Sequence, residues 1–184
     1  CKISKNMKNY LTRSAAALLA LTLLCLSLFS CGKSDDMPDG MKLASGDAVD
    51  YIMYVPQNWV TDISTGVTTA YVSEKDRSNV SLTAFDLEDP NETAPVFWEK
   101  YKDDLLLTFP DADFLEEDNT VIDGSTAAIK RFFTATVTGD PYKFEMVIFN
   151  HFGAMFIFTY TAAQENFDLH LEDIDRIIQN IKLK

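Results

Sequence analysis

Three long runs of β-forming residues, separated by very short connections, constrain the fold of this chain most strongly. The runs occupy residues 127–137, 142–149 and 154–160. Each connection between them has four residues, which suits an antiparallel hairpin and is too short for a crossover. In the middle run, Met146 and Ile148 share one face, and Val147 and Phe149 share the other. The runs therefore predict antiparallel strands in a sheet that is covered on both faces.

The last segment of the chain predicts an amphipathic helix. Its apolar residues recur at intervals of three or four: Phe167, Leu171, Ile174, Ile177, Ile178 and Ile181. Acidic residues gather near its beginning, and Lys182 and Lys184 lie at its end, an order that suits the helix dipole. Burial of this apolar stripe would pack the helix firmly on the sheet and stabilise the fold.

Other elements precede the hairpins. Pro95 suits a first helical position, and the apolar spacing from Phe97 to Thr108 predicts a helix that ends before Pro110. Strand-like runs lie at residues 51–55, 68–73 and 79–85, with a short strand and turn at 120–124. The stretch 113–120 is acidic and mixed, and it is assigned to no element. The order predicts an α+β fold, a largely antiparallel sheet flanked by helices.

The N-terminus has the organisation of a secretory signal peptide. Residues 1–30 hold four basic residues and no acidic one, and they include an uncharged apolar run from Ala15 to Phe29. Because a spanning helix needs roughly 20 apolar residues, a cleavable signal is favoured over a permanent anchor. Leu28–Cys31 resembles a bacterial lipobox, which implies cleavage after Ser30 and diacylglycerol on the Cys31 thiol. The alternative is an ordinary signal followed by an incidental cysteine.

Three segments are expected along the chain. Residues 1–30 form the signal peptide, residues 31–40 a flexible tether, and residues 41–184 one domain. Residues 1–6 precede Met7, which would make a natural start. If the lipobox is used, the domain lies on the extracytoplasmic side of a bacterial membrane, held there by its lipid.

The charge balance argues against two kinds of partner. The chain has 16 basic and 28 acidic residues, a formal net charge of −12. Loss of residues 1–30, with four basic residues and no acidic one, leaves −16. Because phosphate contacts need Lys and Arg, so acidic a chain is not expected to bind nucleic acid or to lie on anionic lipid headgroups.

No motif in the sequence fixes a reaction or a metal. Phosphate-binding loops, nucleophile elbows and zinc-protease spacings are absent from it. Two acidic groups stand out: Asp86, Glu88, Asp89 and Glu92, then Asp111, Asp113, Glu116, Glu117 and Asp118. They could bind Ca²⁺ but lack the spacing of a calcium loop, so a solvated acidic surface is favoured and no cofactor is assigned. His151 and His170 are expected to be ordinary turn or surface residues, and Trp59 a core residue.

The segment after the leader resembles the PsbP/Mog-like family of bacterial lipoproteins. The resemblance rests on Tyr51–Val55 followed by Pro56–Trp59, on Asn79–Phe85 before the first helix, on Val121–Ala127, and on Thr159–Ala162. The family usually closes with Ser-Phe, whereas this chain closes with Asn180–Lys184. The resemblance implies an α/β/α sandwich around an antiparallel sheet. It also implies docking onto a partner, because the family includes a subunit of the photosynthetic oxygen-evolving complex and a small GTPase-binding protein.

The function predicted from these observations is that of a lipid-anchored, non-enzymatic protein that docks onto another envelope protein. A lipoprotein that binds a small molecule or a divalent ion is the main alternative. An enzyme of unrecognised type is the third, and it would require polar side chains that converge in a cleft.

Overall fold

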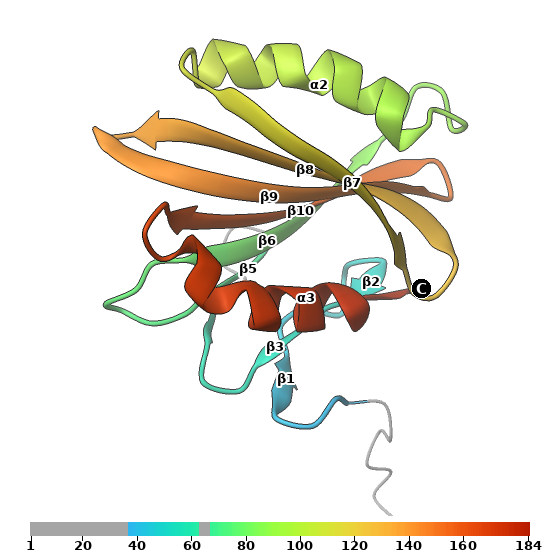
Figure 1. Cartoon of the computed structure of the whole chain (residues 1–184). Helices are drawn as coiled ribbons and strands as arrows, with labels where there is room; N and C mark the ends of the chain where they lie inside the picture. The colour runs from blue at the N-terminus through green and yellow to red at the C-terminus, as the bar shows by residue number, and fades with distance from the viewer. Residues whose placement is uncertain (1–36, 63–66) are drawn as a thin grey trace, which may run out of the picture. The chain divides into compact units, whose positions relative to one another are not determined.

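The computed structural model describes residues 37–62 and 67–184, so Ser30, Cys31 and the signal peptide lie outside the described residues. Over the described residues the chain forms a seven-stranded sheet with a helix on each face (Figure 1). The strand order is β4 (Val60–Asp62), β5 (Thr68–Tyr71), β6 (Asn79–Asp86), β10 (Ala154–Ala163), β9 (Asp140–His151), β8 (Thr126–Val137) and β7 (Asp113–Ile122). All neighbouring strands pair antiparallel. The predicted α+β architecture is therefore confirmed.

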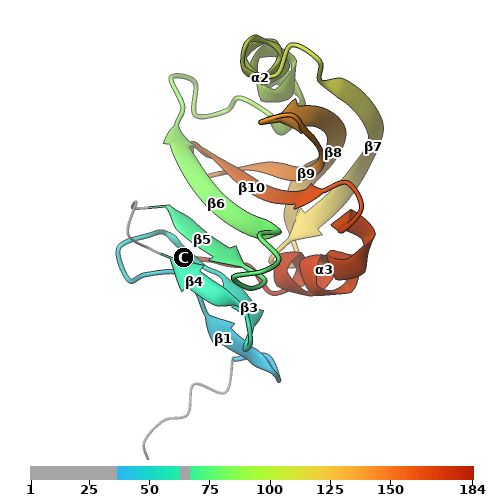
Figure 2. The same ribbon diagram turned by 90° about the vertical axis from the view of Figure 1, so that its left-hand side faces the viewer.

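Each face of the sheet has its own apolar core. Helix α2 (Ala94–Thr108) covers Met146 and Ile148, and its Trp98 is buried against that face. Helix α3 (Leu171–Gln179), which follows the short 3₁₀ helix η1 (Phe167–His170), covers Val147 and Phe149. The two helices lie on opposite sides of the twisted sheet (Figure 2). The predicted division of β9 into two buried faces is thus confirmed.

Several segments differ from the sequence prediction, which had assigned no strand to the short elements β1, β4 and β11. The run 51–55 is split into β2 (Tyr51–Ile52) and β3 (Tyr54–Pro56), because the two halves pair with different strands. Strand β3 pairs with β1 (Met41–Leu43), and β2 pairs with β11 (Lys182–Leu183). Between the two halves, the Met53 carbonyl accepts a hydrogen bond from the Ala44 N–H at 2.8 Å.

The largest difference is strand β7 (Asp113–Ile122), most of which was assigned to no element; only its last residues fall in the short strand predicted at 120–124. It lies at the edge of the sheet, and most of its side chains are exposed, so it lacks the alternation that marks a half-buried strand. Its pairing with β8 is interrupted by a shift in register between Phe114 and Glu117. Acidic side chains and an irregularity are common protections of an exposed edge against pairing with another chain.

The predicted terminal helix is shorter than its apolar stripe. It begins as a 3₁₀ helix at Phe167 and ends at Gln179. Ile181 is nevertheless fully buried, because the chain turns back after the helix and pairs with β2.

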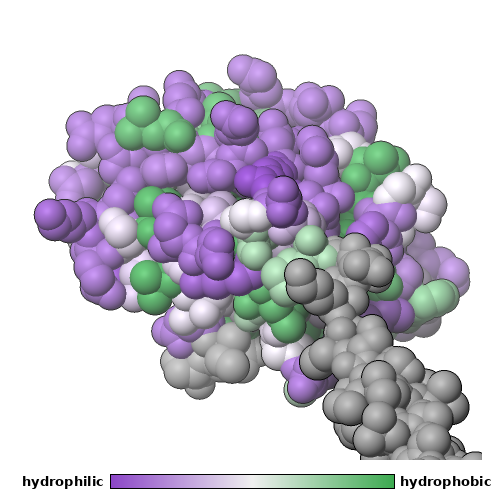
Figure 3. All heavy atoms as spheres, turned by 90° about the horizontal axis from the view of Figure 1, so that it is seen from below, coloured by the Kyte–Doolittle hydropathy of each residue, from purple (hydrophilic) through white to green (hydrophobic). Residues whose placement is uncertain are grey.

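Among the described residues, no helix is long and apolar enough to cross a membrane. Seen from the side of α3, the surface is mostly hydrophilic, with apolar residues in small patches (Figure 3).

A buried ion pair connects the sheet to α3. Lys130 Nζ lies 2.9 Å from Glu145 Oε1 and 3.1 Å from Asp175 Oδ1 of the helix. The Glu145 side chain is almost fully buried, and that burial raises the pKa of its carboxyl although Lys130 acts in the opposite direction. The carboxylate therefore depends on Lys130 for compensation of its charge.

Candidate docking surface

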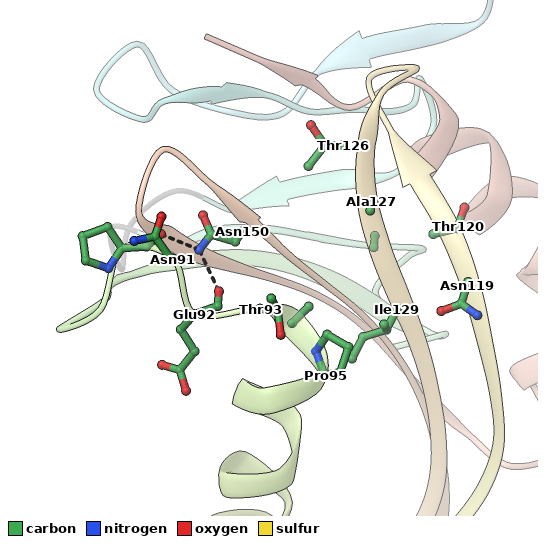
Figure 4. Close-up of a pocket in the computed structure, with 13 residues that line it drawn as sticks. Asn91, Glu92, Thr93, Pro95, Asn119, Thr120, Thr126, Ala127, Ile129 and Asn150 are labelled. Atoms are coloured by element: carbon green, nitrogen blue, oxygen red, sulfur yellow. Dashed lines mark hydrogen bonds between the residues drawn. The ribbon is translucent and has the colours of Figure 1, made fainter.

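The loop between β6 and α2 is held in place by the end of β9 and by the turn that connects β9 to β10. Asn150 Nδ2 donates hydrogen bonds to the Pro90 carbonyl at 2.9 Å and to the Glu92 carbonyl at 2.8 Å. Gly153 lies against the ring of Pro90, and its carbonyl accepts a hydrogen bond from the Leu87 N–H at 3.1 Å. Figure 1 shows this loop and this turn side by side, and Figure 4 shows Asn150 between the two carbonyls. The turn therefore fixes the path of the chain into α2.

Replacement of Asn150 by aspartate tests this arrangement. The carboxylate has the same shape but no donor, so the Pro90 and Glu92 carbonyls would each lose a partner. We expect the free energy of unfolding to fall by about 1–3 kcal/mol, with faster amide exchange in residues 87–93. Asn119→Asp is the matched control, since Asn119 is exposed and its side-chain amide donates no hydrogen bond among the described residues. Equal effects of the two variants on thermal unfolding would contradict the assignment.

The same loop brings the first acidic group together on one groove. The groove has a volume of about 560 Å³ and runs between the loop and the exposed side of α2. Its lining includes Asp86, Glu88, Asp89, Glu92 and Asp104. Among the described residues that line it, Lys100 is the one basic side chain, and it forms an ion pair with Glu92. The groove therefore keeps a clear excess of negative charge.

The α2 wall of the acidic groove is aromatic. The rings of Phe97 and Tyr101, one helical turn apart, stack with centroids 5.4 Å apart and an interplanar angle of 20°. Burial first, and the nearby Asp104 carboxylate second, raise the pKa of Tyr101, so its hydroxyl stays neutral at physiological pH. The Glu92 carboxylate, through its hydrogen bond and its charge, raises the pKa of Lys100, with help from Glu88 and Asp89. A partly buried aromatic surface under carboxylates suits a partner that is both cationic and apolar.

The turn that holds the loop also presents an exposed aromatic side chain. Phe152 is 91% exposed, the largest exposure of any large apolar side chain among the described residues. Phe152 and Gly153 have positive φ values of 48° and 83°, so they form the two-residue turn that connects β9 to β10. A left-handed backbone at a residue other than glycine costs about 1–2 kcal/mol, and asparagine or glycine is the usual choice there.

A second cleft lies on the other side of the loop (Figure 4). It has a volume of about 760 Å³ and is bounded by the start of α2 and by β7, β8 and Asn150. Ala127 and Ile129 supply apolar surface, and Asn91 and Asn119 supply amides. Glu92 is the single charged residue among the described residues that line it. This cleft is consequently close to neutral, in contrast to the acidic groove.

The remaining residues singled out in the sequence do not converge on one site. Trp59 is buried, with its ring centroid 6.2 Å from that of His170, so the expected core position is confirmed. His170 Nε2 lies 2.8 Å from Asp76 Oδ2, whereas the His151 ring lies tilted against that of Phe152 beside the turn between β9 and β10. The second acidic group lies along β7 and the turn before it. Across residues 37–62 and 67–184, no three His, Cys, Asp or Glu side chains lie close enough to hold a metal ion.

Sequence reasoning missed Phe152 and Asn150 as functional candidates. Both lie in the connection between two predicted strands, where Phe152–Gly153 replaces the Asn-Gly pair that commonly forms such a turn. That departure was the available signal for Phe152. The bonds made by Asn150 could not be inferred, because its partners are about 60 residues earlier in the chain.

No family model and no curated protein matches the chain. Among solved structures, it is similar to the cyanobacterial PsbP protein CyanoP of Synechocystis, with a TM-score of 0.62, 14% identity, and coverage of 86% of this chain and 99% of that one. It is also similar to LpqN of Mycobacterium tuberculosis, a protein involved in cell envelope biogenesis, with a TM-score of 0.52, 14% identity and coverage of 78% and 90%. A Pseudomonas aeruginosa protein of unknown function gives a TM-score of 0.53, 14% identity and coverage of 76% and 94%.

These likenesses concern the fold, because the identities are low. The seven-stranded antiparallel sheet, the helix on each face and the near-complete coverage of CyanoP all agree with the resemblance seen in the sequence. The described part of the chain therefore has the PsbP-like α+β fold.

Proposed function

We propose that this protein is a non-enzymatic docking protein of a bacterial envelope, held to the membrane by a lipid on Cys31. It binds a partner protein through the acidic groove. The observation that carries the proposal is the convergence of Asp86, Glu88, Asp89 and Asp104 on a groove with a stacked Phe97–Tyr101 pair. The partner surface that fits this groove is basic and partly apolar.

The position of the groove supports this role. The loop that carries most of its carboxylates is fixed by Asn150 and Gly153, so the charges are presented on a preorganised surface. The fold shared with LpqN, which is involved in cell envelope biogenesis, agrees with an extracytoplasmic role. The lipobox-like Leu28–Cys31 supports attachment to the membrane.

Photo-crosslinking in the producing cell tests the proposal. Val96 is 51% exposed and lines the groove, so p-benzoylphenylalanine in its place would contact a docked partner. We expect one discrete protein adduct whose yield falls at least tenfold in the background Glu88→Lys/Asp104→Lys. Asp140→Lys/Glu165→Lys, which changes the net charge equally at the opposite end of the β9–β10 hairpin, should leave the yield unchanged. An adduct insensitive to both backgrounds, or no adduct, would contradict docking at the groove.

The neutral cleft supports a second candidate function, the binding of a small uncharged molecule. Its volume of about 760 Å³ lies within the range of ligand pockets, and its walls combine apolar surface with amide groups. A screen of neutral polar fragments by NMR should then shift the amides of residues 119–129. Shifts confined to other regions, or none at millimolar fragment, would count against this role.

A further inference from the structure

We propose that Phe152 is the apolar anchor of the docking surface, and that it inserts into an apolar pocket with a basic rim on the partner protein. This inference rests on the proposed docking function and adds the contact that determines how long the complex lasts. Three features carry it: the exposure of the side chain, the strained backbone that presents it, and the acidic groups beside it.

The conformation and the exposure of Phe152 both work against the stability of the isolated protein. The residue has φ of +48°, a region that asparagine or glycine adopts with less strain. Its side chain, 91% exposed, makes little apolar contact in return, apart from the His151 ring, whose centroid lies 4.2 Å from that of Phe152. The same left-handed φ occurs at Asp123 and Thr138, which also precede glycines, so the combination of this conformation with an almost fully exposed aromatic ring is what points to a role in binding.

The turn that carries Phe152 is rigid. It connects β9 and β10, two long strands of the sheet, with only two residues outside the pairing. Asn150 Oδ1 accepts a hydrogen bond from the Gly153 N–H at 3.2 Å, which closes the turn. Gly153 is so close to Pro90 that an added Cβ would lie 3.0 Å from the proline Cβ. The aromatic ring is thus presented on a preorganised base, as interface hot spots commonly are.

The surroundings of Phe152 favour a protein partner over a lipid surface. Asp86 pairs with Ala154 directly after the turn, and Glu88 and Asp89 belong to the loop that packs on Gly153. An anionic headgroup region would repel these carboxylates. A protein pocket rimmed by Lys or Arg would complement them while it buries the ring.

The test separates the anchor from the acidic groove. It uses the mature Cys31→Ser chain and the partner identified by crosslinking from position 96, with p-benzoylphenylalanine at position 152 as a second probe. We expect Phe152→Asn to raise the dissociation constant at least tenfold, about 1.4 kcal/mol, mainly through faster dissociation. Because asparagine suits the left-handed turn, the melting temperature should stay the same or rise. Leu169→Asn, at an apolar residue that is 71% exposed on η1, is the control and should leave binding unchanged.

The possible outcomes distinguish the Phe152 anchor from the docking function of the groove and from a contact with the membrane. Unchanged binding of Phe152→Asn, with weaker binding of Glu88→Lys/Asp104→Lys, would overturn the anchor and leave the docking function standing. Equal binding by wild type and both variants, or no adduct from either position, would overturn both. Flotation of the Cys31→Ser chain with phosphatidylethanolamine–phosphatidylglycerol vesicles that depends on Phe152 would assign the residue to a membrane and overturn the protein pocket.

Discussion

Replacement of Cys31 by serine is expected to move the protein from the membrane fraction to the soluble fraction of the cell. Serine has no thiol to receive diacylglycerol, so the acyl chains that hold the protein would be absent. Each acyl chain contributes about 0.8 kcal/mol per buried CH₂, and stable attachment requires more than one such signal. Fractionation followed by quantitative immunoblotting measures the change.

Cys25→Ser is the matched control for this prediction. Cys25 lies inside the apolar run and follows the bulky Leu24, so it is a poor lipidation site. We expect this variant to remain in the membrane fraction. If Cys31→Ser stayed on the membrane as firmly as wild type, the lipid anchor would be wrong.

Replacement of Lys130 by methionine is expected to destabilise the fold by about 3–5 kcal/mol near neutral pH. Methionine fills a similar volume but leaves the buried Glu145 carboxylate without its cation, and loss of one partner of a buried pair has an effect of this size. Asp175 would lose its contact with Lys130 as well. Chemical denaturation followed by tryptophan fluorescence can measure the difference, since Trp59 and Trp98 are both buried.

The pH dependence gives this prediction a specific signature. Burial raises the pKa of Glu145 above its ordinary value of 4.5, so the folded state binds the proton more tightly than the unfolded state. The free energy of unfolding therefore falls as the pH rises from about 4.5 through the raised pKa. Without Lys130 that pKa should rise further, and the deficit of Lys130→Met should shrink as the solution is acidified.

A double variant provides the control for the buried pair. Lys130→Met/Glu145→Leu removes both charges and should recover most of the lost stability, because apolar replacement of a whole buried pair is often neutral or stabilising. If the deficit of Lys130→Met were independent of pH and persisted in the double variant, packing rather than the carboxylate would be its cause.

The sequence predicted the elements whose residues are buried in a regular pattern. Strands β8, β9 and β10 and both helices were identified because burial imposes the periodicities of strand and helix on their side chains. Most of strand β7 was missed, because its edge position leaves its side chains exposed, and only its last residues lay in the short strand predicted at 120–124. The division of β2 from β3 depends on which strands they pair with, and β11 pairs with a strand about 130 residues earlier in the chain. Such long-range pairing leaves no local pattern.

Only part of the candidate site could be predicted from the sequence. The first acidic group was recognisable because its members lie close together in the chain. These carboxylates meet Asp104, Phe97 and Tyr101 only because of the path that the loop takes along α2. That path is set by Asn150 at the end of β9, far away in the chain. The separation of an acidic groove from a neutral cleft by one loop is likewise a property of the folded chain.

The most direct test of the central claim is a rate of association measured from low to high salt. The two proteins are the Cys31→Ser chain and the partner that photo-crosslinking identifies. If the acidic groove guides docking, the wild-type rate falls steeply as salt rises. Glu88→Lys/Asp104→Lys then associates at least tenfold more slowly at low salt and converges with wild type at high salt. Asp140→Lys/Glu165→Lys retains the wild-type rate within about twofold. An equal fall in the association rate of both variants would show that net charge alone governs the encounter. An unchanged rate in both would show that the groove takes no part in docking.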